Sequence, residues 1–371
     1  MRNNHIILLS FMIAMFLYFT KENILEPNEY LARVVSINNN ELIQRGISKI
    51  GSQNLEIKVL SKDRKGERLK TLNRLNGSAE YDEFYEVGDK MLVRIVESNN
   101  KLIINPISLY RVPTLLFLLG IFAISLILYA KKVGFKSLLS FLAAIGMIYY
   151  HLIPRILKGS SPMMTTFIFI SILTGVIVFS VAGFSKRGGV AFLGTITGLV
   201  AAFLMTQLFL DTLSFTGLTM TMSQALVAAG NFHINLVEIL YSGIIISASG
   251  AAMDIAMDMA VSMEEILENS PNISKKSLIK SGFNIGNAVI GTMSTTLLLA
   301  YTGGNITMMM LLVDRGLSLN TILNSKLVAV EIAKTLIGTT SLLIVAPVTA
   351  FIAAYVYMYN PRIIAKKVVK C

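Results

Sequence analysis

Two aspartates interrupt a stretch that otherwise has the composition of a membrane span. Asp254 and Asp258 lie four residues apart in SGAAMDIAMDMAVSMEEI, so a helix places them on one face, with Glu265 near that face further on. Carboxylates inside a span are costly and usually functional, which predicts a site that binds a cation or relays a proton. The alternative is that a span beginning at Ile234 ends after about 20 residues, at Asp254. Asp258 is then in water, and Asp254 is the stronger candidate.

Other polar residues near predicted spans extend this candidate transport or ion site. Glu238 lies early in the same span, Asn284 and Asn287 enter the next one, and Glu331 lies at the start of the last. Glu331 either pairs with Lys334, three residues on, or faces a cavity. An interfacial position is the simpler interpretation of both glutamates.

The segment between these spans, SMEEILENSPNISKKSLIK, predicts two short cytoplasmic helices around a break at Ser270-Pro271. An acidic turn with Glu264 and Glu265 precedes a basic turn with Lys275 and Lys276. The arrangement is similar in outline to the coupling loop of ABC importer permeases, without that loop's Glu-Ala-Ala core, and it implies a cytoplasmic ATPase as partner. An ordinary cytoplasmic loop is the alternative.

Small residues and a proline indicate how the helices pack. Gly282 and Gly286 form a GxxxG pair, a pattern that permits close helix contact. YTGGN, at residues 301–305, breaks a span before the short apolar run ITMMMLLV, which predicts a re-entrant or interfacial segment. The residues expected to shape packing are Gly250, Gly282, Gly286, Gly303, Gly304, Gly338 and Pro347, the last as a kink.

The composition is that of an integral membrane protein. Of 371 residues, 54% are hydrophobic and 15% charged, and the mean hydropathy is +0.64. We expect an α-helical polytopic membrane bundle of about eight spans: an uncleaved anchor at residues 1–20, and seven spans in residues 112–371, with a cytoplasmic loop at about 256–281. The seven begin with Val112 to Ala130 and Ser137 to Ile153. Lysines and arginines near the span ends predict that both termini are cytoplasmic.

Residues 21–111 form a second, polar region. Alternating runs such as YLARVVSI, NLEIKVL, KMLVRIVE and KLIINPIS predict a small antiparallel β-domain, barrel-like in the OB or SH3 manner and extracytoplasmic. Turns are expected at Asn38-Asn39-Asn40, Asn76-Gly77 and Val87-Gly88-Asp89. The aromatic residues gather in one loop-like stretch, which favours a spacer or docking module over an oligonucleotide-binding one.

Several kinds of chemistry are excluded by what the sequence lacks. The single cysteine is the last residue, and the three histidines lie far apart, so neither a disulfide nor a metal motif is expected. Hydrolase, Walker A and zinc-protease motifs are absent, which predicts neither an enzyme nor a cofactor. The expected partners are the lipid bilayer and either a homologous membrane protein or an ATPase, and no nucleic acid.

The whole chain resembles the YibE/F family of bacterial multi-span membrane proteins, and the resemblance implies a bacterial cell (plasma) membrane. The resemblance rests on the anchor, the β-rich domain ending in YEVGDKMLVRI, and then GAAMDIAMDMAVSMEEI, SGFNIGNAVIGTMSTTLLLAYTGG and VEIAKTLIGTTSLLIVAPVTA in that order. The positions that match the family pattern are Asp254, Gly303, Glu331, Gly338 and Pro347. The resemblance assigns no role to any of them. Asp258 departs from the family pattern, so the resemblance does not make the aspartates one unit.

Three functions are consistent with these observations. The first is a transporter or permease component of unknown substrate, because polar groups lie inside a bundle rich in small residues. The second is a non-transporting scaffold or sensor that displays the β-domain. The third, an intramembrane enzyme, requires the acidic residues to meet in one cavity.

Overall fold

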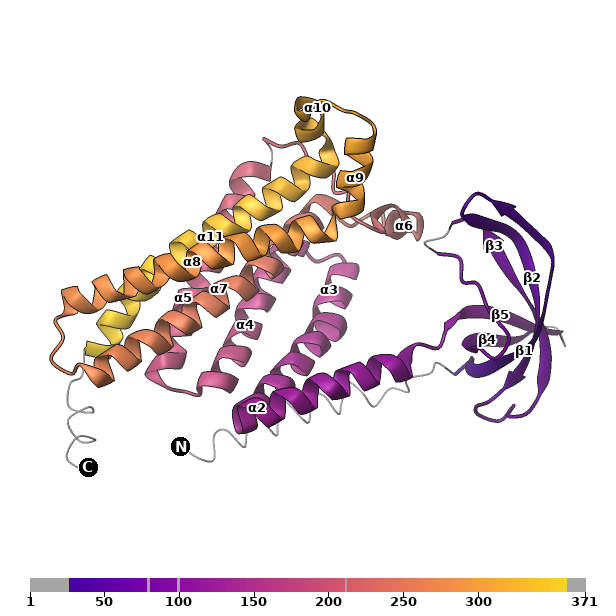
Figure 1. Ribbon diagram of the computed structural model, residues 1–371, viewed down its shortest axis with the longest axis horizontal. Helices are drawn as coiled ribbons and strands as arrows, with labels where there is room; N and C mark the ends of the chain where they lie inside the picture. The colour runs from indigo at the N-terminus through magenta and orange to yellow at the C-terminus, as the bar shows by residue number, and fades with distance from the viewer. Residues whose placement is uncertain (1–26, 79–80, 99–100, 211, 359–371) are drawn as a thin grey trace. The chain divides into compact units, whose positions relative to one another are not determined.

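The computed structural model describes residues 27–78, 81–98, 101–210 and 212–358 (Figure 1). They form two compact units that divide between Lys131 and Lys132. The first unit is a β-sheet followed by a helical segment, and the second is built of helices. The anchor expected at residues 1–20 lies outside the described residues.

Five antiparallel strands build the first unit: β1 (Glu29–Arg45), β2 (Ser48–Val59), β3 (Arg68–Asn76), β4 (Lys90–Ser98) and β5 (Lys101–Leu109). Their order in the sheet is β3-β2-β1-β4-β5. Side chains alternate between the two faces of a strand, so Ala32 and Val34 on β1 and Ile57 on β2 are buried on one face. That face is the core of the unit.

The two edge strands of this sheet approach each other through a side chain. The hydroxyl of Thr71 on β3 donates a hydrogen bond to the carbonyl of Ile104 on β5 at 2.6 Å. Within the described ranges no strand ladder joins β3 to β5. The antiparallel β-domain is therefore confirmed, and its closure as a barrel stays a prediction.

One strand and three turns of the sheet can be compared with the sequence prediction. β3 is not among the alternating runs that predict strands, because its sequence RLKTLNRLN is largely polar. The predicted turn at Asn38-Asn39-Asn40 is wrong: these residues lie inside β1, at a register shift between Asn38 and Glu41. The turns at Gly77 and Gly88 are confirmed, with φ of 82° and 100°, values that glycine adopts without strain.

A buried amide fastens the segment between β3 and β4. Gln53 on β2 is fully buried; it accepts a hydrogen bond from the backbone N–H of Tyr85 and donates one to the Tyr85 carbonyl, both at 3.1 Å. Asn73 on β3 donates to Gln53 at 3.0 Å and to the carbonyl of Glu83 at 2.7 Å. These two amides hold the segment, with the buried Tyr85 ring, against the sheet.

The helices follow in chain order. They are α2 (Val112–Met147), the π-helical turn η1 (Ile148–Leu152), α3 (Ile153–Leu157), α4 (Pro162–Ala182), α5 (Lys186–Leu210), α6 (Ser223–Ala228), α7 (Leu236–Asn269), α8 (Lys275–Gly304), α9 (Ile306–Asp314), α10 (Leu319–Asn324) and α11 (Lys326–Met358). Six helical segments in the described part of the chain are long and apolar enough to cross a membrane. The helical membrane architecture is therefore supported.

The number of spans stays a prediction. The first of the six segments is 46 residues long, Val112–Leu157, and covers two stretches that the sequence predicts as separate spans. Between those stretches the backbone leaves helical geometry at Lys131, with φ of 49° and ψ of −120°. The described part of the chain has six apolar helical segments, and the predicted number of eight spans stays a prediction.

The two short helices expected between the sixth and seventh spans are not present. α7 continues without a break to Asn269, and α8 begins at Lys275 after a turn of five residues. Ser274 caps α8, because its hydroxyl accepts a hydrogen bond from the N–H of Ser277 at 3.1 Å. The acidic and basic turns are thus the ends of long helices.

The other end of α8 also differs in detail from the prediction. α8 runs through Gly303 and ends at Gly304, and the nine-residue α9 follows directly after Asn305. At 1.5 Å per residue α9 is about 14 Å long, too short to cross a bilayer. α11 is one helix from Lys326 to Met358 that passes through Pro347.

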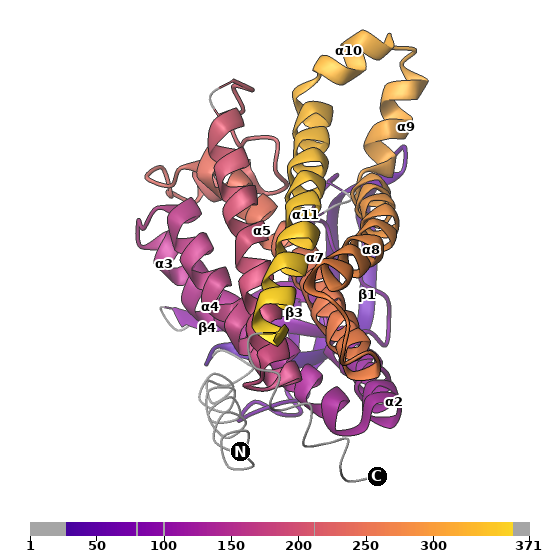
Figure 2. The ribbon, with the colours of Figure 1, turned by 90° about the vertical axis from the view of Figure 1, so that its left-hand side faces the viewer.

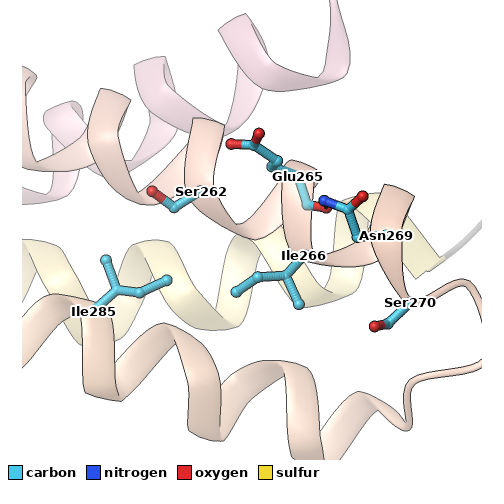
Figure 3. Close-up of a pocket in the computed structure, with 6 residues that line it drawn as sticks. All are labelled: Ser262, Glu265, Ile266, Asn269, Ser270 and Ile285. Atoms are coloured by element: carbon cyan, nitrogen blue, oxygen red, sulfur yellow. The ribbon is translucent and has the colours of Figure 1, made fainter.

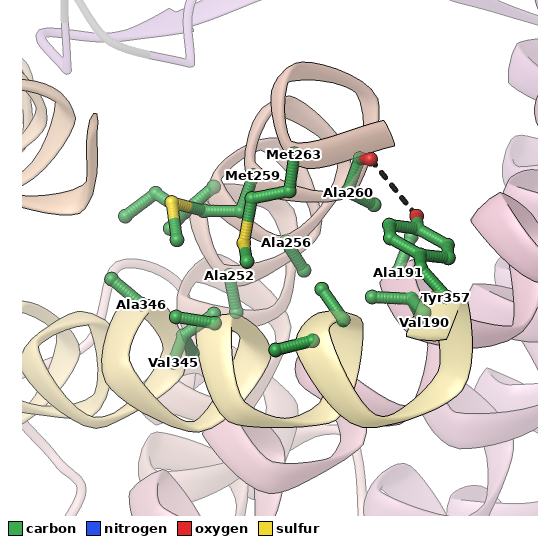
Figure 4. Close-up of a cluster of buried hydrophobic side chains, with 14 of the residues drawn as sticks. Val190, Ala191, Ala252, Ala256, Met259, Ala260, Met263, Val345, Ala346 and Tyr357 are labelled. Atoms are coloured by element: carbon green, nitrogen blue, oxygen red, sulfur yellow. Dashed lines mark hydrogen bonds between the residues drawn. The ribbon is translucent and has the colours of Figure 1, made fainter. Parts of the chain in front are cut away.

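The helical unit has its densest core where α5, α7, α8 and α11 meet (Figures 2 and 4). A β-carbon on Gly198 of α5 would lie 2.3 Å from Val345 of α11 and 3.0 Å from Ala252 of α7. A β-carbon on Gly282 of α8 would lie 2.8 Å from Met263 of α7. Small residues therefore let these four backbones approach closely, the packing expected of helices in lipid.

Candidate functional site

One end of the helical unit is marked by Glu238, in the first turn of α7. Its Oε2 accepts a hydrogen bond from the hydroxyl of Ser161 at 2.5 Å and one from the backbone N–H of Met163 at 3.3 Å. Both partners lie at the start of α4. A carboxylate at a helix N-terminus interacts favourably with its unpaired N–H groups. The starts of α4 and α7 are therefore level with each other.

The other end is marked by Arg187, at the start of α5. Its Nε donates to Oε2 of Glu264 on α7 at 2.5 Å. The neighbouring Lys186 donates from Nζ to the carbonyl of Val356, near the end of α11, at 3.1 Å. α4 connects the two ends with 21 residues, about 31 Å of helix, which matches a bilayer's hydrocarbon thickness.

Asp254 and Asp258 lie between these two markers. They precede Glu264 by ten and six residues, or about 15 and 9 Å along the α7 axis. The neighbouring Ala252 and Ala256 pack on Gly198 and Gly194 of α5, well inside that helix. Both aspartates therefore lie on α7 between the two ends of the helical unit, where α7 is still packed on α5.

Asp254, Asp258 and Glu265 form an exposed line on α7, which we call the acidic stripe. No hydrogen bond or ion pair to their carboxylates occurs within the described residues. The opposite side of α7 carries the buried Met259 and Met263. The stripe is thus on the outer side of the four-helix core.

A groove of about 440 Å³ lies between α7 and α8 beside Glu265, at the C-terminal end of the stripe (Figure 3). Ile266 of α7 and Ile285 of α8 lie between the two helices, and the carboxylate of Glu265 points away from α8. The groove is lined by Ser262, Glu265, Ile266, Asn269, Ser270 and Ile285.

Asn284 and Asn287 lie on an exposed side of α8. Their side chains have no hydrogen-bond partner in the described part of the chain. Gly282 and Gly286, by contrast, are buried against α7 and α11. α8 therefore has a packed side of glycines and an outward side of amides.

The remaining acidic candidates are not brought together with Asp254. Glu238 precedes it by sixteen residues on the same helix, about 24 Å along the axis. Glu331 accepts a hydrogen bond from Nζ of Lys334 at 2.7 Å, within α11. The structure thus gives three separate acidic positions, and the described residues contain no group of three metal-ligating side chains.

The residues of the expected coupling loop divide in two. Glu264 pairs with Arg187, and the ammonium of Lys275 lies 3.8 Å from the ring centroid of Tyr355 on α11. Glu265 and Lys276 are exposed and have no such contact within the described ranges.

The expected packing glycines differ in their surroundings. Gly250, Gly303 and Gly304 have open space where a β-carbon would be. A β-carbon on Gly338 would lie 3.8 Å from the hydroxyl of Tyr301, which itself donates to Ser247 of α7 at 2.8 Å. The end of α8 is thus held to α7 and lies beside α11.

Three residues of this region are not among the candidates that the sequence predicts. Gly194 and Gly198 form the most closely packed pair, and the sequence GTITG carries the same GxxxG spacing as the pair that was recognised. As a basic residue near a span end, Arg187 indicates only the orientation of the chain in the membrane. Its pairing with Glu264 has no local sequence signal.

A five-stranded antiparallel β-domain joined to six apolar helical segments defines the class as a polytopic helical membrane protein with an N-terminal β-domain. The family model described as YibE/F-like protein matches residues 118–359, and that of the YibE/F family N-terminal domain matches residues 28–108. The chain belongs to the YibE/F-like family. No curated protein and no solved structure matches it.

Proposed function

We propose that this protein is a transporter or permease component in which Asp254 binds a cation or proton as it crosses the membrane. The observation that carries the proposal is the position of Asp254. It lies between the markers at Glu238 and Arg187, is exposed, and has no side-chain partner among the described residues. A carboxylate at that depth is costly unless a cation, a proton or water stabilises it.

The acidic stripe supports a direction of movement. Asp254, Asp258 and Glu265 follow one another along α7 toward its C-terminal end, about 6 Å and then about 10.5 Å apart along the axis. Carboxylates in series let a bound cation pass from one to the next, because none holds it strongly. Asp258 is then a step on the path rather than a group in water.

The proposed orientation places the C-terminal end of α7 in the cytoplasm. Lys186 and Arg187 at the start of α5, and Lys275, Lys276 and Lys280 at the start of α8, lie near that end. An excess of basic residues is typical of cytoplasmic segments. The β-domain is then extracytoplasmic, in a plasma membrane, as the sequence analysis expects.

Proton flux into liposomes tests the proposal. The full chain is reconstituted with a pH-sensitive dye inside, a potassium diffusion potential is imposed, and acidification is followed with and without a sodium gradient. We expect faster flux than in protein-free vesicles, and we expect Asp254→Asn to reduce it to the protein-free rate. Glu268→Gln is the matched control, because Glu268 is an exposed acid on α7 beyond Glu264. Equal flux in the Asp254→Asn variant and the wild type would remove Asp254 from the proposal.

A second candidate function, a scaffold or sensor, is favoured by one contact of the β-domain. Arg111, next to the start of α2, holds Glu83 with two hydrogen bonds of 2.6 and 3.0 Å. A bidentate pair fixes orientation as well as distance, so movement of the β-domain is passed to α2. Deleting residues 28–109 separates the two functions: flux should persist in a transporter, whereas a scaffold should lose all activity.

A further inference from the structure

The outward side of α8 is polar although the helix crosses the membrane region. Asn284 lies two residues from both Gly282 and Gly286, so it is on nearly the opposite side of α8 from the packed glycines. Lys280, Asn287 and Gly291 are exposed as well. An uncovered amide in lipid is costly, because lipid offers it no hydrogen bond. This side therefore requires a polar partner.

The polar side of α8 and the acidic stripe of α7 lie at the same depth along their helices. Gly282 lies against Met263, and Gly286 lies against Met259. The two helices are therefore antiparallel, and a step of one residue along α8 corresponds to a step of one residue backward along α7.

This register places the outward residues of α8 at the same depth as those of the acidic stripe on α7. Lys280 is level with Glu265, Asn287 with Asp258, and Gly291 with Asp254. Yet no ion pair joins Lys280 to Glu265 within the described residues, since each side chain is directed outward from its own helix.

A second copy of this chain offers a polar or oppositely charged group at each depth of the acidic stripe and of the polar side of α8. Copies inserted in the same orientation are related by a two-fold axis along the membrane normal, so residues of equal depth face each other across it. The basic and amide side of one α8 then meets the acidic stripe of the partner's α7, and the reverse contact forms at the same time. A mainly apolar helix cannot supply these groups.

Two glycines leave space for such an approach. A β-carbon on Gly250 of α7 or on Gly291 of α8 would meet nothing within 4 Å. Both residues are exposed at the level of the stripe or just beyond it. Small residues at these positions permit close contact with a further helix.

We propose that the protein is a two-fold homodimer in which α8 of each copy packs on the acidic stripe of the other. The partner contributes the amides of Asn284 and Asn287 to the surroundings of Asp258, and its Lys280 to Glu265. The carboxylates are thereby enclosed between two copies rather than exposed to lipid. This assembly stands whether or not the protein moves a cation.

Disulfide cross-linking in native membranes tests the contact. The only cysteine is removed by Cys371→Ser, and two differently tagged copies carry Asp254→Cys and Gly291→Cys. We expect a mild oxidant to join the two tags, because a disulfide forms only when the Cα atoms come within about 7 Å. The control is Ile172→Cys in both copies; Ile172 is 55% exposed on α4 and lies outside the proposed interface.

Charge reversal provides a second test that does not depend on disulfide geometry. Glu265→Lys and Lys280→Glu each place like charges in both contacts of a homodimer, and self-association should weaken by about tenfold or more. When the two variants are expressed together, each lysine again meets a glutamate, so mixed dimers should recover. Single-molecule photobleaching in lipid counts the copies.

Cross-linking of the two tags with recovery of mixed dimers supports the proposal. Monomers at all densities, cross-links at Ile172 alone, or charge reversals that leave self-association unchanged would overturn it. Capture of a different membrane protein by this surface, without self-association, would overturn it as well.

Discussion

A β-carbon on Gly194 of α5 would lie 2.2 Å from Oγ1 of Thr349 on α11 and 3.1 Å from Cβ of Ala256 on α7. Thr349 is fully buried, so its side chain has no space to withdraw. We expect Gly194→Ala to lower the free energy of unfolding by about 1–3 kcal/mol, the usual cost of overpacking a core. Denaturant titration in detergent measures it.

The matched control for this prediction lies on the same helix. Gly189 also has a helical backbone, but a β-carbon there would meet nothing within 4 Å. Gly189→Ala should therefore be neutral or stabilising by up to about 1 kcal/mol, as expected when alanine replaces glycine in a helix. Equal stability of the two variants would show that Gly194 is not tightly packed.

The sequence predicts the presence of the long helices better than the depth at which their residues lie. The length of a span alone places the end of the sixth span at Asp254, because about 20 residues after Ile234 are enough to cross a bilayer. The contacts Ser161–Glu238 and Arg187–Glu264 instead place Asp254 between the two ends of the helical unit, and each joins residues 77 apart in the chain. No local pattern contains that information.

The sequence also does not predict which small residues pack against a neighbouring helix. Gly250 and Gly282 look alike as small residues in apolar runs, yet Gly282 is buried between α7 and α11 whereas Gly250 is open. In the β-domain, period-two alternation finds four strands, because burial on one face repeats along the chain. Gln53 interrupts that pattern, and only the folded loop at Tyr85 explains its burial.

The second prediction concerns this buried amide. Gln53→Leu keeps a similar volume but leaves the N–H and C=O of Tyr85 without a partner, and it removes one of the two hydrogen bonds of the Asn73 amide. Unsatisfied buried groups cost about 1–3 kcal/mol each, so we expect a loss of about 3 kcal/mol in the stability of this segment. Hydrogen exchange of residues 81–88, measured by mass spectrometry on the full chain, should accelerate.

The control for Gln53 is Gln44→Leu. Gln44 lies exposed on β1, and its side-chain amide donates a hydrogen bond to the carbonyl of Gly46 at 2.7 Å. Its replacement should leave exchange in residues 81–88 unchanged. If Gln53→Leu also left that exchange unchanged, the amide would not be what holds the segment.

The third prediction is a dependence of the β-domain on alkaline pH. Burial raises the pKa of the Tyr85 hydroxyl above its ordinary value of about 10, and the nearby Glu83 carboxylate adds to the effect. The folded state therefore keeps the proton that the unfolded state loses. The resulting stability is fully present below about pH 10 and is lost as the pH rises above that value.

Absorbance titration and unfolding at several pH values measure this effect. Tyr85→Phe should remove the part of the pH dependence above pH 10 that belongs to this residue, with little change at neutral pH. A wild type and a Tyr85→Phe variant that lose stability in parallel above pH 10 would rule out Tyr85 as the cause.

The fourth prediction distinguishes two roles of Glu331: binding a transported ion, or forming an ion pair with Lys334 that stabilises the fold. Its carboxylate lies 2.7 Å from Nζ of Lys334, and both side chains are about three-quarters buried, at 24% and 22% exposed. Glu331→Gln leaves the lysine unpaired in this partly buried position, and we expect a loss of about 1–2 kcal/mol in stability, below the cost at fully buried sites. The exchanged variant, Glu331→Lys with Lys334→Glu, keeps opposite charges three residues apart and should recover most of that loss. Proton flux in liposomes should then match the wild type, because the pair serves the fold. An exchanged variant that is as stable as the wild type but transports no cation would instead place Glu331 on the path with Asp254.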